Sequence, residues 1–110
     1  PSAQITGAPY GRGDLAGSLV IQWTTSDDLL ADKPINLAYS VEPNGPWTNI
    51  ATGLENSGTY AWKVGGEVPP RVFLRLQATD AAGNFTFNQT NQPLDLSGLV
   101  PKARILGVEK

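Results

Sequence analysis

The sequence predicts an all-β fold, a sandwich of two antiparallel sheets with about seven strands. Apolar and polar residues alternate with a period of two in many short segments, whereas helical periodicity is hard to find. Twelve glycines and nine prolines interrupt these segments at short intervals, as turns do in all-β domains. The chain has 110 residues, of which 40% are hydrophobic and 16% are charged. It therefore has the size and composition of one folded domain, not of a disordered segment.

Several segments carry the strand pattern, and the clearest is 71–79. There Val72, Leu74, Leu76 and Ala78 occupy alternate positions, so we expect one face of this strand to be buried. The seven expected strands are 3–6, 17–24, 35–41, 47–51, 59–64, 71–79 and 85–90. The residues expected in the core are Leu19, Ile21, Trp23, Leu37, Tyr39, Trp62, Leu74, Leu76 and Ala78.

The third expected strand has distinctive sequence on both sides. Segment 35–41 has an apolar or aromatic residue at every second position as far as Val41, and these residues are expected to face inward. Before it, 26–30 favours a single helical turn, which Pro34 limits. After it, Pro43-Asn44-Gly45 predicts a tight hairpin turn, because Asn-Gly tolerates the positive φ that such turns need.

Composition removes most catalytic and metal-binding chemistry. The chain has no histidine and no cysteine, so it lacks the usual general base near neutral pH, thiolate nucleophiles, structural zinc sites and disulfides. The net charge of −2 gives no basic surface for nucleic acid. Apolar runs are only a few residues long, so no membrane insertion is expected. We therefore expect a non-catalytic domain with no cofactor.

A short repeat indicates tandem domains. The sequence Pro1-Ser-Ala-Gln-Ile-Thr-Gly7 and the sequence Pro101-Lys-Ala-Arg-Ile-Leu-Gly107 share Pro, Ala, Ile and Gly at the same spacing. Their separation is the length of one sandwich domain. We expect residues 1–100 to form one module and 101–110 to be a linker and the first strand of a similar following module; chance agreement is the alternative. Neighbouring domains of the same chain are then the first expected partners.

Two segments carry a resemblance to a known family. Ser18-Leu-Val-Ile-Gln-Trp23 resembles the second strand of a fibronectin type III module, and Tyr39 lies where such modules place an aromatic residue in the third strand. The pattern V-x-L-x-L-x-A-x-D-x-x-G-N over 72–84 is similar to their sixth strand and following turn, and to the last hairpin of many bacterial immunoglobulin-like repeats. The resemblance covers about 1–96. It implies an immunoglobulin-like sandwich that serves as a spacer or binding unit in a secreted or cell-surface protein.

One tripeptide suggests adhesion. Arg12-Gly13-Asp14 is the sequence that integrins recognise in an exposed loop, and it lies between the first two expected strands with glycines on both sides. An ordinary turn is the simpler interpretation, since a turn needs the same residue types.

Carboxylates gather at one expected end of the sandwich. Asp27, Asp28, Asp32 and Asp80 lie in or beside loops that should emerge at the same end as the N-terminus, together with Glu55. Such oxygen ligands suit Ca²⁺, which takes six to eight of them. The alternative is that Asp27 and Asp80 hold turns while the others are solvated.

Three aromatic residues are candidates for ligand contact. The rings of Trp23, Tyr39, Tyr60 and Trp62 fall on the apolar faces of their strands, which favours core packing. The orientations of Trp47, Phe73 and Phe85 are open. Exposed rings here would indicate a carbohydrate or protein contact. Lateral packing between neighbouring strands is the alternative.

Taken together, these patterns favour a non-catalytic structural or interaction module of a multidomain secreted or cell-surface protein. The alternatives are a carbohydrate-binding module appended to an extracellular enzyme, and an adhesion or calcium-binding module. An enzyme that uses Asp27, Asp28, Asp32 or Asp80 as acid and base ranks lowest, because loops this short rarely form a pocket.

Overall fold

The computed structural model describes residues 2–26 and 30–99, in which strands are separated by short loops. The elements in these residues are β1 (Ala3–Gly7), the 3₁₀ turn η1 (Gly13–Leu15), β2 (Ser18–Thr25), β3 (Leu30–Ser40), β4 (Thr48–Leu54), β5 (Thr59–Lys63), β6 (Arg71–Asp80), β7 (Phe85–Gln89) and β8 (Leu94–Asp95). No helix among the described residues has the length and hydropathy needed to cross a bilayer.

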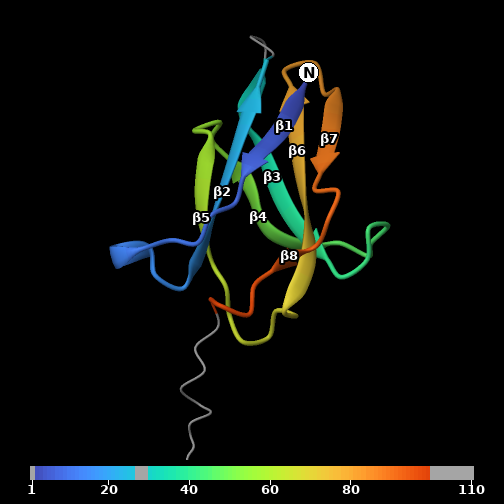
Figure 1. Cartoon of the computed structure of the whole chain (residues 1–110). Coiled ribbons are helices and arrows are strands. Elements are labelled where there is room, and N and C mark those ends of the chain that lie inside the picture. The colour runs from blue at the N-terminus through green and yellow to red at the C-terminus, as the bar shows by residue number, and fades with distance from the viewer. Residues whose placement is uncertain (1, 27–29, 100–110) are drawn as a thin grey trace, which may run out of the picture.

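The strands form two antiparallel sheets that pack face to face (Figure 1). The smaller sheet has three strands in the order β1-β2-β5. The larger has five: four run in the order β4-β3-β6-β7, and the short β8 pairs with the beginning of β6 beyond the point where β7 ends. The predicted all-β sandwich is therefore confirmed. Each of the seven predicted strands is present, and β8 was not predicted.

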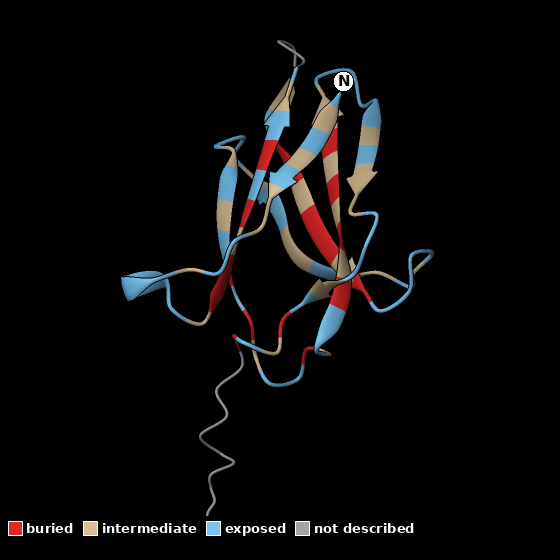
Figure 2. Cartoon of the chain, in the orientation of Figure 1, coloured by how far each residue is buried: buried red, intermediate tan, exposed pale blue. Residues whose placement is uncertain are grey.

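The core fills the space between the sheets, where Figure 2 shows the buried positions along β2, β3 and β6. Eight of the nine predicted core residues are buried. The ninth, Tyr39, is half-buried, and its ring stacks on Trp62 of the opposite sheet with a centroid distance of 5.3 Å. Leu96 and Leu99 are also buried, so the segment after β8 closes one end of the core.

Strand β3 departs from the prediction at both ends. It begins at Leu30, which pairs with Asp80, so the helical turn expected over 26–30 is wrong at Leu30; residues 27–29 lie outside the described part of the chain. A register shift before Ile35 accommodates Pro34, which has no N–H for a regular ladder. Val41 was expected to face inward but is 53% exposed, because β3 ends one residue before it.

Side-chain hydrogen bonds join parts of the chain that are distant in sequence. The Asn88 Oδ1 atom on β7 accepts the backbone N–H of Ile5 on β1 at 2.7 Å, which links the edges of the two sheets. The Tyr10 hydroxyl donates to the backbone carbonyl of Asp95 at 2.6 Å. The described chain starts at one end of the sandwich and ends at the other (Figure 1).

Candidate functional site

The outward face of the five-stranded sheet carries exposed aromatic side chains. Along β6 the buried residues alternate with half-buried ones, so Arg75 and Gln77 point away from the core. Phe87 on β7 lies opposite Gln77, and Phe85 lies opposite Thr79. Because directly opposed residues share a face, both phenylalanines are on the outward side. Phe85 is 56% and Phe87 46% exposed to solvent.

The guanidinium of Arg75 lies against two of the rings on this face. Its Cζ atom is 4.6 Å from the ring centroid of Trp47 and 4.4 Å from that of Phe87, within the range of cation–π attraction. The Phe85 and Phe87 rings meet edge to face, with centroids 5.2 Å apart and an interplanar angle of 68°. We call Trp47, Arg75, Phe85 and Phe87 the aromatic–arginine face.

The sheet order explains how these side chains meet. Trp47 precedes β4 at one edge of the large sheet, Phe87 is on β7 at the other, and β3 and β6 lie between them. Small outward residues on β3 leave room for the longer side chains: Ala38 lies opposite Arg75 and Ser40 opposite Phe73. Both small residues are buried even though they point away from the core. The longer side chains beside Ala38 and Ser40 therefore cover this part of the outward face.

A hydrogen bond fixes the loop that carries Trp47. The side-chain Nε2 of Gln89, at the end of β7, donates to the backbone carbonyl of Pro43 at 3.0 Å. Gln89 lies opposite Arg75 in the ladder. The β3–β4 loop is thus attached to β7 across the sheet, and this attachment restricts the position of Trp47 relative to Arg75.

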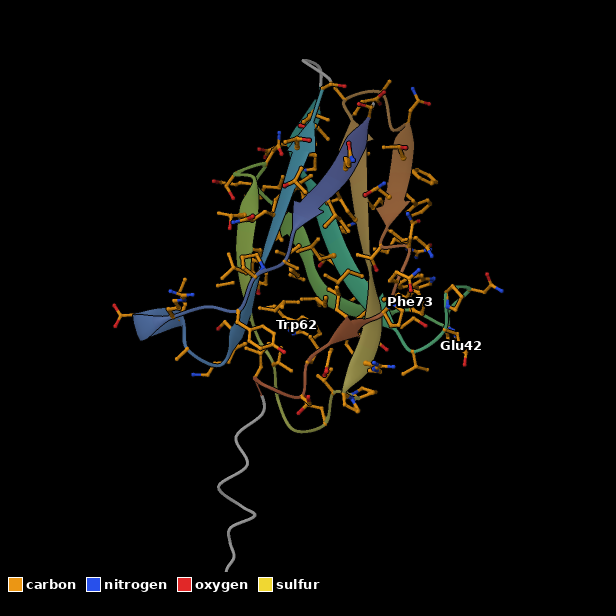
Figure 3. All side chains as sticks on the ribbon, in the orientation of Figure 1. Glu42, Trp62 and Phe73 are labelled. Atoms are coloured by element: carbon orange, nitrogen blue, oxygen red, sulfur yellow. The ribbon has the colours of Figure 1, made fainter. Side chains whose placement is uncertain are left out.

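The three aromatic residues singled out in the sequence have different positions in the structure. Trp47 is half-buried and Phe85 exposed, and both belong to the aromatic–arginine face. Phe73 is half-buried next to the β3–β4 loop that carries Glu42 (Figure 3), whereas Trp62 is a buried core residue of the other sheet. Sequence reasoning missed Phe87, although its alternation with Phe85 in a segment already expected to be a strand was a usable signal.

Two of the four candidate calcium ligands lie in the described part of the chain. Asp32 is exposed on β3, and Asp80 ends β6; Asp27 and Asp28 lie outside the described residues. No group of three or more His, Cys, Asp or Glu side chains that could hold a metal ion occurs within 2–26 and 30–99. A calcium site that includes Asp27 and Asp28 stays a prediction.

The Asp80 carboxylate holds the turn between β6 and β7. Its Oδ1 atom accepts the backbone N–H groups of Ala82 and Asn84, each at 2.9 Å, and its Oδ2 atom accepts the Asn84 side-chain amide at 3.2 Å. Desolvation raises the pKa of Asp80, but the hydrogen bonds from Asn84 and Ala82 together outweigh it and hold the pKa below its ordinary value. This carboxylate therefore acts within its own turn, as the alternative interpretation expected.

The Arg12-Gly13-Asp14 tripeptide lies in an exposed loop that projects from the side of the sandwich (Figure 1). Its last two residues begin η1, where the backbone N–H of Leu15 donates to the carbonyl of Arg12 at 2.9 Å. Gly13 has a φ of 59°, which favours glycine. The tripeptide is thus accessible and adopts a tight turn.

A shallow open depression of about 380 Å³ lies between β1 and the segment that joins β7 to β8. Its lining residues are Gln4, Ile5, Asn88, Gln89, Thr90, Asn91, Gln92 and Leu94. Asn88 and Gln89 already form the hydrogen bonds described above, and the Thr90 hydroxyl accepts the backbone N–H of Leu74 at 3.2 Å. None of the lining side chains is charged, so the depression offers polar contacts without a carboxylate or ammonium group.

Comparison of the chain with protein-family models, with curated proteins and with solved structures found no match.

Proposed function

We propose that this chain is a non-catalytic interaction module that binds another protein through the aromatic–arginine face. The observation that carries the proposal is the pair of exposed rings, Phe85 and Phe87, on a sheet face where Arg75 lies against aromatic rings. Aromatic residues and arginine are enriched in the centres of protein interfaces. Clustered exposed apolar side chains on a folded domain commonly mark a contact surface.

The core of the domain does not need the exposed parts of the Phe85 and Phe87 rings. The opposite face of β6 already supplies four fully buried residues to the core, namely Val72, Leu74, Leu76 and Ala78. Phe85 and Phe87 keep about half of their surface in water, so much of their apolar area contributes nothing to the stability of the isolated domain. A partner that covers these two rings would bury that apolar area, and the burial would favour binding.

Carbohydrate is the second candidate ligand, and the ring geometry ranks it lower. Stacking of sugar rings on a flat platform needs coplanar aromatic side chains, but the Phe85 and Phe87 rings are inclined at 68°. The depression lined by Asn and Gln side chains supports a saccharide contact, because amides pair well with hydroxyl groups. Part of this hydrogen-bonding capacity is already used within the protein.

We further propose that the module is fibronectin type III-like and belongs to a tandem array in a secreted or cell-surface protein. The repeated Pro-x-Ala-x-Ile-x-Gly sequence supports this, because its first copy includes the whole of β1. A domain whose described ends lie at opposite poles also suits a linear array (Figure 1). The spacing of neighbours and the presentation of a contact face are compatible roles for one module.

The test selects ligands without assuming a partner. A random linear peptide library would be panned on the immobilised chain, and recovered peptides would be titrated in solution by calorimetry. We expect Phe87→Ala to weaken binding of these peptides by about tenfold or more, as at an interface hot spot. The matched control, Thr59→Ala on the exposed β5 strand of the other sheet, should leave binding unchanged. Peptides that bind both variants equally, or binding only on a glycan array, would overturn the proposal.

A further inference from the structure

We infer that the partner presents a side-chain carboxylate to Arg75, from an aspartate or glutamate flanked by apolar residues. This inference rests on the proposed function and specifies the chemistry of the partner. The outward face of β6 and β7 carries two charged residues, Arg71 at the start of β6 and Arg75 near its middle. The other outward positions are Phe73, Gln77, Thr79, Phe85, Phe87 and Gln89. Arg71 lies opposite Asp95 of β8, whereas the residues opposite Arg75 are the uncharged Ala38 and Gln89.

The contacts of Arg75 leave its hydrogen-bonding groups available. In the described part of the chain its guanidinium contacts the Trp47 and Phe87 rings and forms no ion pair. Aromatic rings attract the charge but accept no regular hydrogen bonds from a stacked guanidinium, whose five N–H donors point outward in its own plane. A planar acceptor that approaches this edge can take two parallel hydrogen bonds, which is the geometry of an arginine–carboxylate pair.

The rings also reduce the cost of forming such a pair. An ordinary exposed ion pair contributes little, partly because two long side chains must be ordered. Arg75 is half-buried and already held between Trp47 and Phe87, so less of its conformational entropy remains to be lost. Once a partner covers Phe85 and Phe87, water is excluded around the guanidinium and the attraction strengthens.

The residues around Arg75 also determine which residues should flank the carboxylate in the partner. Phe85 and Phe87 extend the surface on the β7 side of Arg75, and they require apolar side chains opposite them. Gln77 lies beside Phe87 on β6, and it can pair with backbone groups of the partner. The complementary segment is therefore an acidic residue within a short apolar sequence, which differs from the polyanionic surface that a basic patch would select.

The experiment uses the peptides recovered above as probes. We expect them to contain an aspartate or glutamate among apolar residues. Replacement of that residue by asparagine or glutamine should weaken binding to the unaltered chain by about tenfold, the effect of one charge-assisted hydrogen-bonded pair. Arg75→Gln should produce a similar loss and should remove the difference between the acidic and amide peptides. Arg75→Lys should retain only part of the affinity for the acidic peptides, because an ammonium group cannot form the paired hydrogen bonds.

The outcomes separate the inference from the function on which it rests. If Phe87→Ala weakens binding but the acidic and amide peptides bind the unaltered chain equally, the carboxylate inference is wrong and the interaction face stands. Because this comparison changes only the peptide, it does not depend on the folding of a variant. If Phe87→Ala has no effect, or no peptide is recovered, both proposals fail. Selective binding of uronic-acid glycans without peptide binding would likewise contradict a protein partner.

Discussion

The two faces of the five-stranded sheet use the same strands for different purposes. On β6, Leu74 and Leu76 are fully buried, whereas Arg75 between them is half-buried and lies on the outward side. On β7, Thr86 and Asn88 turn inward and Asn88 holds β1, while Phe85 and Phe87 remain exposed. Because side chains alternate at every residue of a strand, one short segment supplies both the core and the proposed contact surface.

The outward face of this sheet is closely packed although it faces solvent. The outward face has a layer of its own, in which Ala38 is 7% and Ser40 2% exposed beneath longer side chains. This layer orders Arg75 without burying it. The inner face therefore supplies the core, and the outer face determines which groups are presented and in what orientation.

The largest expected effect separates two tryptophans. Trp23 is 3% exposed, and its Nε1 donates to Asn56 at 3.0 Å, so Trp23→Ala should lower the free energy of unfolding by roughly 3–5 kcal/mol. Trp47→Ala, on the outward side, should cost less than half as much. Urea denaturation of the two variants measures this difference. Equal losses would show that the outward layer is as important for folding as the core.

The second largest expected effect is the stability lost when Arg75 no longer contacts the rings of the outward layer. Arg75→Gln removes both cation–π contacts, and we expect a loss of about 1–1.5 kcal/mol in the free energy of unfolding. A double-mutant cycle with Phe87→Ala should give a coupling of about 0.5–1 kcal/mol. Additive effects, with no coupling, would mean that the guanidinium and the ring do not interact in solution.

A smaller effect is expected at the most exposed ring. Phe85 is 56% exposed, so Phe85→Ala should change the free energy of unfolding by less than about 1 kcal/mol. Leu76→Ala is the matched inner-face control, with an expected loss of about 2–5 kcal/mol. Denaturation midpoints report both changes. A large loss for Phe85→Ala would assign this ring to folding and would weaken its assignment to a contact surface.

The smallest expected effect is at Asp80, in the turn at the end of β6, which lies outside both faces of the sheet compared above. Because the folded pKa of Asp80 lies below its ordinary value of 3.8, its contribution is fully present above that value and is lost as pH falls through the folded pKa. Unfolding monitored between about pH 6 and pH 2 should therefore show a weaker acid dependence for Asp80→Asn than for the unaltered chain. Identical pH profiles would contradict the role of the ionised carboxylate.

Much of the fold was readable from local patterns, because alternation reports directly on burial. The inward residues of β2 and β6 follow from their period of two and are buried. The register of β3 could not be predicted so simply. Its ladders shift near Ile35 and again between Leu37 and Ala38, and each shift changes which residues oppose one another. Val41 was misplaced because local alternation does not show where a strand ends.

The candidate site was only partly predictable for a different reason. Trp47 and Phe85 were recognisable as rings of open orientation, but their relation to Arg75 depends on the sheet order, which brings together residues from three separate segments. Arg75 looked like an ordinary polar position in an alternating strand. Only the pairing of β6 with β3 on one side and β7 on the other places it between aromatic rings.

The position of β1 has a mechanical consequence. A pull between the two ends of the described chain has a component along β1 and β2, which both extend in the long direction of the sandwich (Figure 1). Hydrogen bonds in an antiparallel ladder lie perpendicular to the strands, so this load shears the whole β1–β2 ladder at once instead of opening it one bond at a time. The Asn88 side chain carries part of the same load through Ile5. We therefore expect tension between the two ends to be shared across both sheets before β1 detaches.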